Sequence, residues 1–195
     1  MKKTLLILMI LLSFELYSQE TTSFSNAEFE FCLTKKCRET VCEITKIEIF
    51  KNEILKQTIK PGENYFSITI PDDHLFVFED MDFDGKVDFR LMKFLPTEPN
   101  ISFLYWIYNP KNELFEESKN YAEITSPEFD YEKKQIISNW RDCCCKRGRD
   151  TYELKSGIPK LIKRFIIGED SYGYGYTETW KLINGKLELT RQTIE

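Results

Sequence analysis

Short apolar and aromatic runs alternate with turn residues such as Pro61 and Gly62 along the chain from Ile44 onward. Runs of this length, rich in β-branched and aromatic residues, are typical of strands and too short for most helices. The densest run, residues 101–108 (ISFLYWIY), favours a strand. A helix is expected only at residues 112–121, where Glu and Lys are frequent. The pattern predicts an all-β fold, either an antiparallel β-sandwich or a barrel-like fold built from hairpins.

Two segments of the C-terminal third resemble each other. Residues 151–157 (TYELKSG) match residues 179–185 (TWKLING), and each segment is followed by an apolar run that ends near a basic residue. The Ser-Gly and Asn-Gly pairs within these segments predict hairpin turns, because glycine adopts the positive φ angles of a tight turn at little cost. Two copies indicate a repeated antiparallel unit, since two repeats are too few for a solenoid.

The start of the chain has the pattern of a secretory signal peptide. Lys2 and Lys3 precede an apolar run at residues 5–12, which is shorter than the ~20 residues of a membrane span. We expect a periplasmic or secreted protein with no membrane insertion after signal cleavage; the alternative is an uncleaved anchor. The expected division is a signal peptide at 1–18, a Cys-containing N-terminal segment at 19–43 that is irregular up to residue 31, and a single β domain at 44–195.

The composition disfavours several classes of function. The 195 residues carry 27 Lys and Arg against 32 Asp and Glu, a formal net charge of −5. An acidic chain without a long basic run is a poor candidate for binding nucleic acid or an anionic membrane. The single histidine, His74, weighs against His-based zinc sites and against nucleophiles paired with histidine. We therefore expect a protein that is not an enzyme and has no nucleic-acid partner.

Six cysteines fall into two clusters, and an even count in an oxidising compartment favours disulfides. Neighbouring cysteines bridge one another only with strain, so we expect the triplet at 143–145 to pair with the N-terminal cluster. The alternative is a thiolate metal site. The cysteines are Cys32, Cys37, Cys42, Cys143, Cys144 and Cys145.

The most specific motif is the acidic loop at residues 80–88 (DMDFDGKVD). Its carboxylates occupy positions 1, 3, 5 and 9 and glycine occupies position 6, as in the first three-quarters of a calcium loop. Close carboxylates repel by about 4 kcal/mol per pair at an effective dielectric constant near 20, and a divalent cation removes that cost. The glutamate of position 12 is replaced by Leu91. The expected ligands of Ca²⁺ are Asp80, Asp82, Asp84, Asp88 and the main-chain carbonyl of Lys86.

The runs that flank the loop, residues 75–78 and 87–94, are predicted strands, so we expect a strand–loop–strand calcium site with a structural role. By alternation, Val87, Phe89 and Leu91 point inward, and Met81 and Phe83 face away from the ion. The alternative is a solvated acidic turn.

The order of these motifs resembles a known family. The acidic loop is followed by residues 105–110 (YWIYNP), residues 124–130 (ITSPEFD) and a closing Asn-Gly hairpin. This is similar to the exported bacterial calcium-binding proteins with a lysozyme-inhibitor-like β fold. At least one branch of that family serves as periplasmic immunity protein against a secreted peptidoglycan hydrolase. The resemblance implies calcium ligation at the acidic loop and a loop that inserts into a hydrolase cleft, but the family's inhibitory residues do not carry over.

Two segments suit a binding role. Residues 140–149 form a local positive cluster with Arg141, Lys146, Arg147 and Arg149, which could pair with the carboxylates of a glycoside hydrolase. Residues 168–176 mix Tyr, Gly and Ser, a composition that suits contact surfaces because tyrosine buries large area with few torsions to freeze. The tyrosines are Tyr172, Tyr174 and Tyr176. The alternatives are arginines that solvate a loop and tyrosines that alternate with glycines on a strand.

The leading functional hypothesis is an exported calcium-binding β protein that acts as inhibitor or immunity protein of a cell-wall glycan hydrolase. Its partner would be a secreted or periplasmic peptidoglycan hydrolase. The alternative is a calcium-stabilised, non-enzymatic module of the cell envelope that binds glycan or protein, because the aromatic residues and the Tyr/Gly segment fit this hypothesis equally well.

Overall fold

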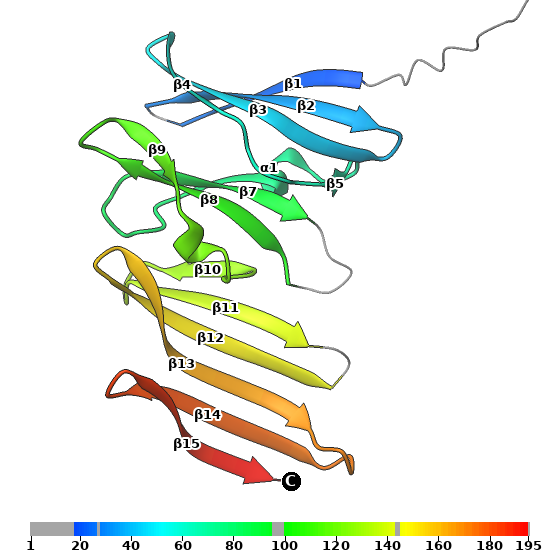
Figure 1. Cartoon of the computed structure of the whole chain (residues 1–195), viewed down its shortest axis with the longest axis vertical. Helices are drawn as coiled ribbons and strands as arrows, with labels where there is room; N and C mark the ends of the chain where they lie inside the picture. The colour runs from blue at the N-terminus through cyan, green and yellow to red at the C-terminus, as the bar shows by residue number, and fades with distance from the viewer. Residues whose placement is uncertain (1–17, 27, 95–99, 143–144, 195) are drawn as a thin grey trace, which may run out of the picture.

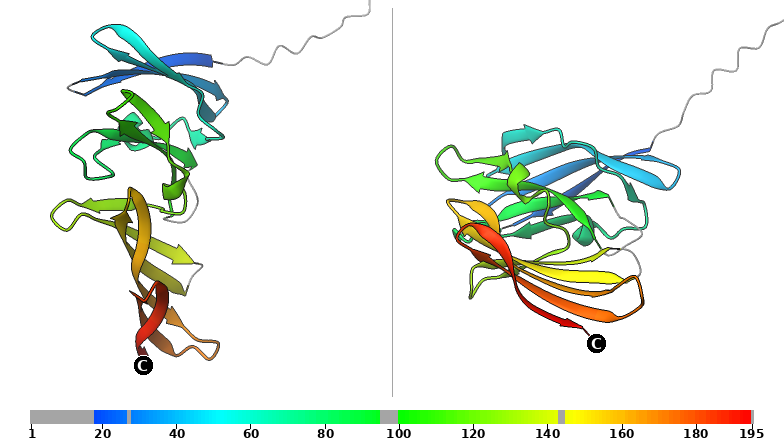
Figure 2. Two further views of the ribbon diagram at one scale, coloured as in Figure 1. Left: turned by 60° about the vertical axis from the view of Figure 1, so that its left-hand side comes forward. Right: turned by 60° about the horizontal axis from the view of Figure 1, so that its bottom comes forward.

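The computed structural model describes residues 18–26, 28–94, 100–142 and 145–194 (Figure 1). These residues form an all-β protein in which three antiparallel sheets pack as a sandwich, so the predicted fold class is confirmed. The sheets follow one another along the long axis of the molecule, in the order of the sequence (Figures 1 and 2). Among the described residues, no helix is long and apolar enough to cross a membrane.

The first sheet has the strand order β1-β2-β3-β4, with β5 paired to β3. Residues 19–31, which we expected to be irregular, instead contain β1, and β1 pairs with β2 from Ser18 opposite Cys37 to Ser25 opposite Glu30. The polar composition that suggested a loose segment suits an edge strand whose side chains are mostly exposed. The strands are β1 (Ser18–Ser25), β2 (Glu30–Arg38), β3 (Val41–Lys51), β4 (Ile54–Ile59) and β5 (Phe66–Ser67).

The second sheet has the order β6-β7-β8-β9 and is preceded by the short helix α1 (Asp72–Leu75). The helix expected at residues 112–121 is wrong: this stretch contains β9 and a single 3₁₀ turn, η1 (Lys119–Tyr121). Burial decides the outcome, because Phe115 of β9 packs against Phe31 and Phe89 between two sheets. The strands are β6 (Phe76–Glu79), β7 (Asp88–Phe94), β8 (Ser102–Asn109) and β9 (Leu114–Glu117).

The third sheet is a six-stranded meander from β10 to β15. Both predicted hairpins are present, and their turn residues have positive φ: Ser156 at 53° and Gly157 at 76°, Asn184 at 49° and Gly185 at 83°. Two consecutive positive φ angles define the type I′ turn that matches the twist of a hairpin. The strands are β10 (Pro127–Asp130), β11 (Gln135–Asp142), β12 (Lys146–Lys155), β13 (Ile158–Glu169), β14 (Gly175–Ile183) and β15 (Lys186–Ile194).

Aromatic side chains fill the space between the first two sheets. Phe31 of β2 is fully buried and lies 5.6 Å from Phe76 and 5.4 Å from Phe89, measured between ring centroids. Phe89 in turn stacks on Trp106 at 4.9 Å. Each buried aromatic contributes about 1.5–3 kcal/mol through the water it excludes, so this cluster is the main apolar connection between the two sheets.

The second and third sheets meet around Arg90, which is 9% exposed. Its guanidinium pairs with Glu79 and lies over the rings of Phe103 and Phe129, at 4.9 and 5.5 Å. Nearby, Ser138 of β11 donates to the carbonyl oxygen of Thr125 at 2.6 Å. The junction therefore combines cation–π contacts with hydrogen bonds to the connecting segment before β10.

The outer strands of the third sheet have no covering layer: no residue of β14 or β15 is buried. Elsewhere in the third sheet, aromatic rings cover glycines of the adjacent strand. The Trp140 ring lies against Gly148, and the Tyr176 ring lies against Gly168. A ring over a glycine shields backbone that a side chain would otherwise cover, which is a known way to stabilise glycine in a sheet.

The predicted link between the two cysteine clusters is wrong for two of the cysteines. Cys37 and Cys42 form a disulfide with each other across the β2–β3 hairpin, while Cys32 is unpaired and its sulfur lies 3.4 Å from the Ser23 hydroxyl. Strand pairing holds cysteines that face each other in a hairpin within bonding distance. Closing such a short loop also costs less conformational entropy than closing a long one. Cys143 and Cys144 lie outside the described residues, and Cys145 is a turn residue directly before β12.

We predict that Gly148→Ala destabilises the protein by about 1–3 kcal/mol. An added methyl group would collide with the Trp140 ring and come 2.8 Å from the Phe165 carbonyl oxygen. Chemical unfolding measured by tryptophan fluorescence would report both the loss of stability and the displaced indole. Gly175→Ala is the matched control, because a methyl group there meets nothing within 4 Å; equal stability of the two variants would contradict the prediction.

Candidate metal site and basic pocket

The acidic loop connects two adjacent strands, as predicted: β6 ends at Glu79 and β7 begins at Asp88. The loop winds around its own carboxylates. Asp80 accepts from the backbone N–H groups of Asp84 and Gly85, and Gly85 has φ of 85°. Only glycine adopts this conformation at little cost, which explains its place in the motif.

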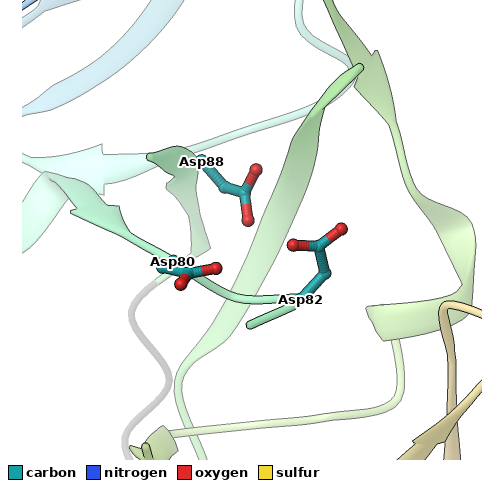
Figure 3. Close-up of side chains that lie close together, drawn as sticks. All are labelled: Asp80, Asp82 and Asp88. Atoms are coloured by element: carbon teal, nitrogen blue, oxygen red, sulfur yellow. The ribbon is translucent and has the colours of Figure 1, made fainter. Parts of the chain in front are cut away.

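Three of the predicted ligands converge. Oxygen atoms of Asp80, Asp82 and Asp88 all lie within 4.8 Å of one another, and their carboxylates point toward a common centre (Figure 3). Oxygen atoms at this spacing suit a hard cation such as Ca²⁺, whose ligands lie 2.3–2.6 Å from the ion. The site therefore has the donor chemistry for a metal ion, supplied by side chains from both ends of the loop.

Asp88 has two roles in the structure. It is fully buried, and its two oxygens accept from the backbone N–H groups of Met81 and Tyr108, each at 2.8 Å. Burial raises the pKa of Asp88 to about 7, although the two hydrogen bonds oppose the shift. Asp88 thus fixes the acidic loop to the end of β8, and a cation beside it would favour the ionised form.

Asp82 and Asp84 differ in their environments. Burial and the negative charge of Asp84 raise the pKa of Asp82 to about 6. Asp84 is exposed and accepts from the N–H of Lys86 at 2.7 Å, and it is not part of the converging group. The Lys86 ammonium lies 3.7 Å from the carboxylate of Glu28, which belongs to the β1–β2 connection. Ligation by Asp84 and by the Lys86 carbonyl stays a prediction.

The apolar residues of the loop and of the following strand differ in their burial and contacts. Phe89 and Leu91 are fully buried as predicted, but Val87 is 39% exposed because β7 begins one residue later. Met81 is fully buried, and its carbonyl accepts from the Tyr121 hydroxyl at 3.1 Å. Phe83 packs against Phe129 of the third sheet, at 6.1 Å between ring centroids. The loop is therefore part of the junction between the second and third sheets.

A second candidate site lies on the third sheet, where a pocket of about 720 Å³ opens between β11, β12, β13 and β14. Five of the predicted partner-binding residues line it: Arg141, Lys146, Arg147, Arg149 and Tyr176. We expected the arginines to lie on a loop, but they lie on strands. β11 continues to Asp142 and β12 starts at Lys146. The hairpin extends nearly to its tip, so these side chains project from paired strands.

The strand register places the arginines on one face of the sheet. Arg141 lies directly opposite Arg147, which pairs with Ile167, and Arg149 pairs with Phe165. Residues that face each other across antiparallel strands project to the same side, and so do residues two apart along a strand. We call these three residues the arginine ladder; Phe165 and Ile167 form its apolar floor. Lys146 and Tyr176 alternate to the opposite face.

Two polar contacts hold this region. The side-chain amide of Asn100 both donates to the carbonyl oxygen and accepts from the N–H of Arg141, at 2.6 and 2.8 Å. Asp150, 2% exposed, accepts two hydrogen bonds from Arg164 on the adjacent strand, at 2.7 and 2.6 Å. These contacts fix the backbone of β11 and the alignment of β12 with β13, and they pre-organise the pocket.

The other two predicted tyrosines lie beside the pocket without lining it. Tyr172 and Tyr174 are exposed in the β13–β14 turn, 85% and 59% respectively. The Asp170 carboxylate accepts from the backbone N–H groups of both, at 2.8 and 2.9 Å. The turn is thus ordered by Asp170 and leaves both rings in solvent.

The sequence analysis did not identify the apolar floor of the pocket, because only the strand register shows that Phe165 and Ile167 share a face with the arginines.

Comparisons with known proteins bear on the fold alone. No protein-family model matches the chain, and no curated protein matches it. Among solved structures, the chain is similar to one described as a Xanthomonas type IV secretion system related protein, with a TM-score of 0.53 and 16% sequence identity. The similarity covers 89% of this chain and 86% of that chain. The resemblance to lysozyme-inhibitor-like proteins stays a hypothesis.

We predict that Asp88→Ala costs about 2–4 kcal/mol of stability in metal-free buffer, because two buried N–H groups lose their acceptor. The measurement is urea unfolding in the presence of a chelator. Asp84→Ala is the matched control in the same loop: its carboxylate is exposed, so we expect a loss below about 1 kcal/mol. Equal losses would show that Asp88 does not carry the connection to β8.

Proposed function

We propose that this chain is an exported, calcium-stabilised protein of the cell envelope that binds and inhibits a glycan hydrolase of the cell wall. The observation that carries the proposal is the pocket that gathers Arg141, Arg147 and Arg149 on one face of the third sheet. Arginine pairs with carboxylates through charge-assisted, bidentate hydrogen bonds, so this face suits an acidic surface of such an enzyme. The Cys37–Cys42 disulfide supports export, because disulfides persist in oxidising compartments.

The arrangement of charge supports a binding role for the arginine ladder. Arg141 faces Arg147 across the strands in a chain of net charge −5. An anionic partner would make charge-assisted hydrogen bonds with such a group of guanidinium side chains. A cleft lined mainly by one sign of charge focuses its field and raises the local concentration of an oppositely charged partner, which favours a ligand for the ladder.

Calcium has a structural role in this proposal. Asp80, Asp82 and Asp88 would ligate the ion, and Asp88 also holds the backbone of Tyr108 in β8. Through Phe83, which contacts Phe129, the same loop reaches the third sheet. An ion in the loop would therefore fix the orientation of the pocket-bearing sheet relative to the rest of the protein, at a distance from the contact itself.

A second candidate function is a non-enzymatic envelope module that binds glycan or another protein. The observation that favours it is the concavity of the site, since small ligands are typically held in pockets of 300–1,000 Å³, and the volume here is about 720 Å³. The two candidates differ in their partner and share the same surface, so one set of variants tests both.

Calcium should raise the thermal stability. With a dissociation constant near 10⁻⁴ M, as in other extracellular modules, 10 mM calcium gives about 2.7 kcal/mol and a rise in melting temperature of roughly 5–10 °C. The double variant Asp80→Asn/Asp82→Asn should lose this rise. Glu63→Gln/Asp73→Asn is the control, because both side chains are exposed and lie outside the acidic loop. An unchanged melting temperature in calcium and in chelator would refute the metal site.

Inhibition should depend on the arginine ladder. We expect the purified protein to slow the lysis of cell-wall suspensions by at least one peptidoglycan hydrolase in a panel of muramidases and other wall-cleaving enzymes. Arg147→Glu/Arg149→Glu should raise the half-inhibitory concentration roughly tenfold or more. Lys155→Glu/Lys186→Glu makes the same charge change on the same sheet outside the pocket and should inhibit like the parent protein.

If no hydrolase in the panel is slowed while wall-derived oligosaccharides bind, the envelope-module hypothesis replaces the inhibitor hypothesis. If the two double variants lose inhibition equally, the effect is one of net charge, and the arginine ladder has no specific role.

A further inference from the structure

The shape of the basic site restricts how a partner can contact it. The arginine ladder and its floor line a pocket in this chain rather than a protruding loop. The carboxylates of a glycan hydrolase also lie in a cleft. Two concave surfaces cannot come into close contact, because a gap filled with water would separate their charged groups. A partner therefore has to present a protruding segment to this pocket.

The lining defines the chemistry of that segment. On the face of the arginine ladder, the lining has three basic residues, Arg141, Arg147 and Arg149, and one acidic residue, Glu169. On the face of the arginine ladder, the row of Arg149 and Phe165 continues through Thr179 to Arg191 of β15, so positive charge extends beyond the pocket. A segment with two negative charges, one near Arg147 and one near Arg149, would complement this pattern.

The floor adds a requirement that a simple anion does not meet. Phe165 and Ile167 are half-buried and lie between the arginines of β12 and the threonines of β14. An apolar group that covers them would gain about 25 cal/mol for each Å² of apolar surface removed from water. The complementary segment thus carries an apolar side chain flanked by carboxylates.

The strand arrangement gives the site its preference for protein. Arginine binds a carboxylate through two parallel hydrogen bonds, which imposes a planar, bidentate geometry. Alternate residues of an extended strand project about 7 Å apart on one side, a spacing similar to that between Arg147 and Arg149, which are themselves alternate residues of β12. A peptide that runs along β12 with acidic residues at alternate positions would match this spacing.

From these features we infer that the pocket between β11 and β14 receives a protruding acidic segment of a protein partner, with carboxylates on the arginine ladder and an apolar side chain on Phe165 and Ile167. This inference rests on the proposed function for the identity of the partner. It differs from active-site insertion, because the contact on the hydrolase lies outside its catalytic cleft and the inserted element belongs to the partner.

The test is a titration of the ¹⁵N-labelled protein, in calcium, with three short capped peptides: acetyl-Glu-Leu-Asp-amide, acetyl-Gln-Leu-Asn-amide and acetyl-Glu-Gly-Asp-amide. We expect the first peptide to shift the amide signals of β11 to β14 around the pocket. The neutral peptide and the glycine peptide should bind more weakly by roughly tenfold and threefold, in keeping with charge-assisted bonds and one buried side chain. Arg147→Glu/Arg149→Glu should abolish these shifts, and Lys155→Glu/Lys186→Glu should preserve them.

Several results would overturn the inference. One is a neutral peptide that binds as well as the acidic one, and another is a set of shifts that lies elsewhere on the molecule. A third is an alginate oligosaccharide or inorganic phosphate that binds at the pocket more tightly than the acidic peptide, which would assign the site to anionic polymers. Far-ultraviolet circular dichroism of the charge-reversal variant excludes unfolding as the cause of lost binding.

The inference and the proposed function fail separately. If the acidic peptide binds the pocket and no hydrolase is inhibited, the inference stands and the partner is a different acidic protein. If a hydrolase is inhibited through the arginine ladder but the acidic peptide does not compete, the proposed function stands and the inference is refuted, since the contact is then made inside the cleft.

Discussion

Asp88 connects more of this molecule than any other polar side chain of the acidic loop. Its buried carboxylate accepts the N–H of Met81 at the start of the loop and the N–H of Tyr108 at the end of β8. A carboxylate in this position is costly to bury unless its charge is compensated, and the negative charges of Asp82 and Asp84 add to that cost, so a cation bound among the aspartates would favour the ionised form. The loop also packs Phe83 against Phe129, so its conformation affects how the third sheet is held.

The sequence predicts the fold class and the hairpins well, because short β-forming runs and Asn-Gly or Ser-Gly turns are local signals. It fails where tertiary contacts decide. The segment around Phe115 has a helix-like composition, but burial of that ring against Phe31 makes it a strand. The polar segment at β1 becomes ordered by pairing with β2, and Cys37 pairs with Cys42 because the hairpin brings the two together. None of these outcomes is encoded in the local pattern alone.

The same difference between local sequence signals and tertiary contacts applies to the two candidate sites. The spacing of Asp80, Asp82 and Asp88 is sufficient to predict their convergence, since all three belong to one tight loop. The basic cluster was also evident, but its geometry depends on register across four strands. Register places Phe165 and Ile167 with the arginines and moves Lys146 and Tyr176 to the other face. The Tyr176 ring covers Gly168, which gives this tyrosine a structural role that composition does not reveal.

Because the three sheets follow one another in sequence order, the two ends of the molecule carry different sheets. β1 lies at one end of the long axis and β15 at the other (Figure 1), and the pocket belongs to the sheet that ends in β15. Ile194 pairs with Tyr176, one of the residues that line the pocket, so a fusion partner joined to the C-terminal end would lie next to the strands that form it. An attachment that precedes β1 would instead hold the protein at its far end and display the pocket outward, which makes the N-terminal side the place for a tether, a label or an immobilising group.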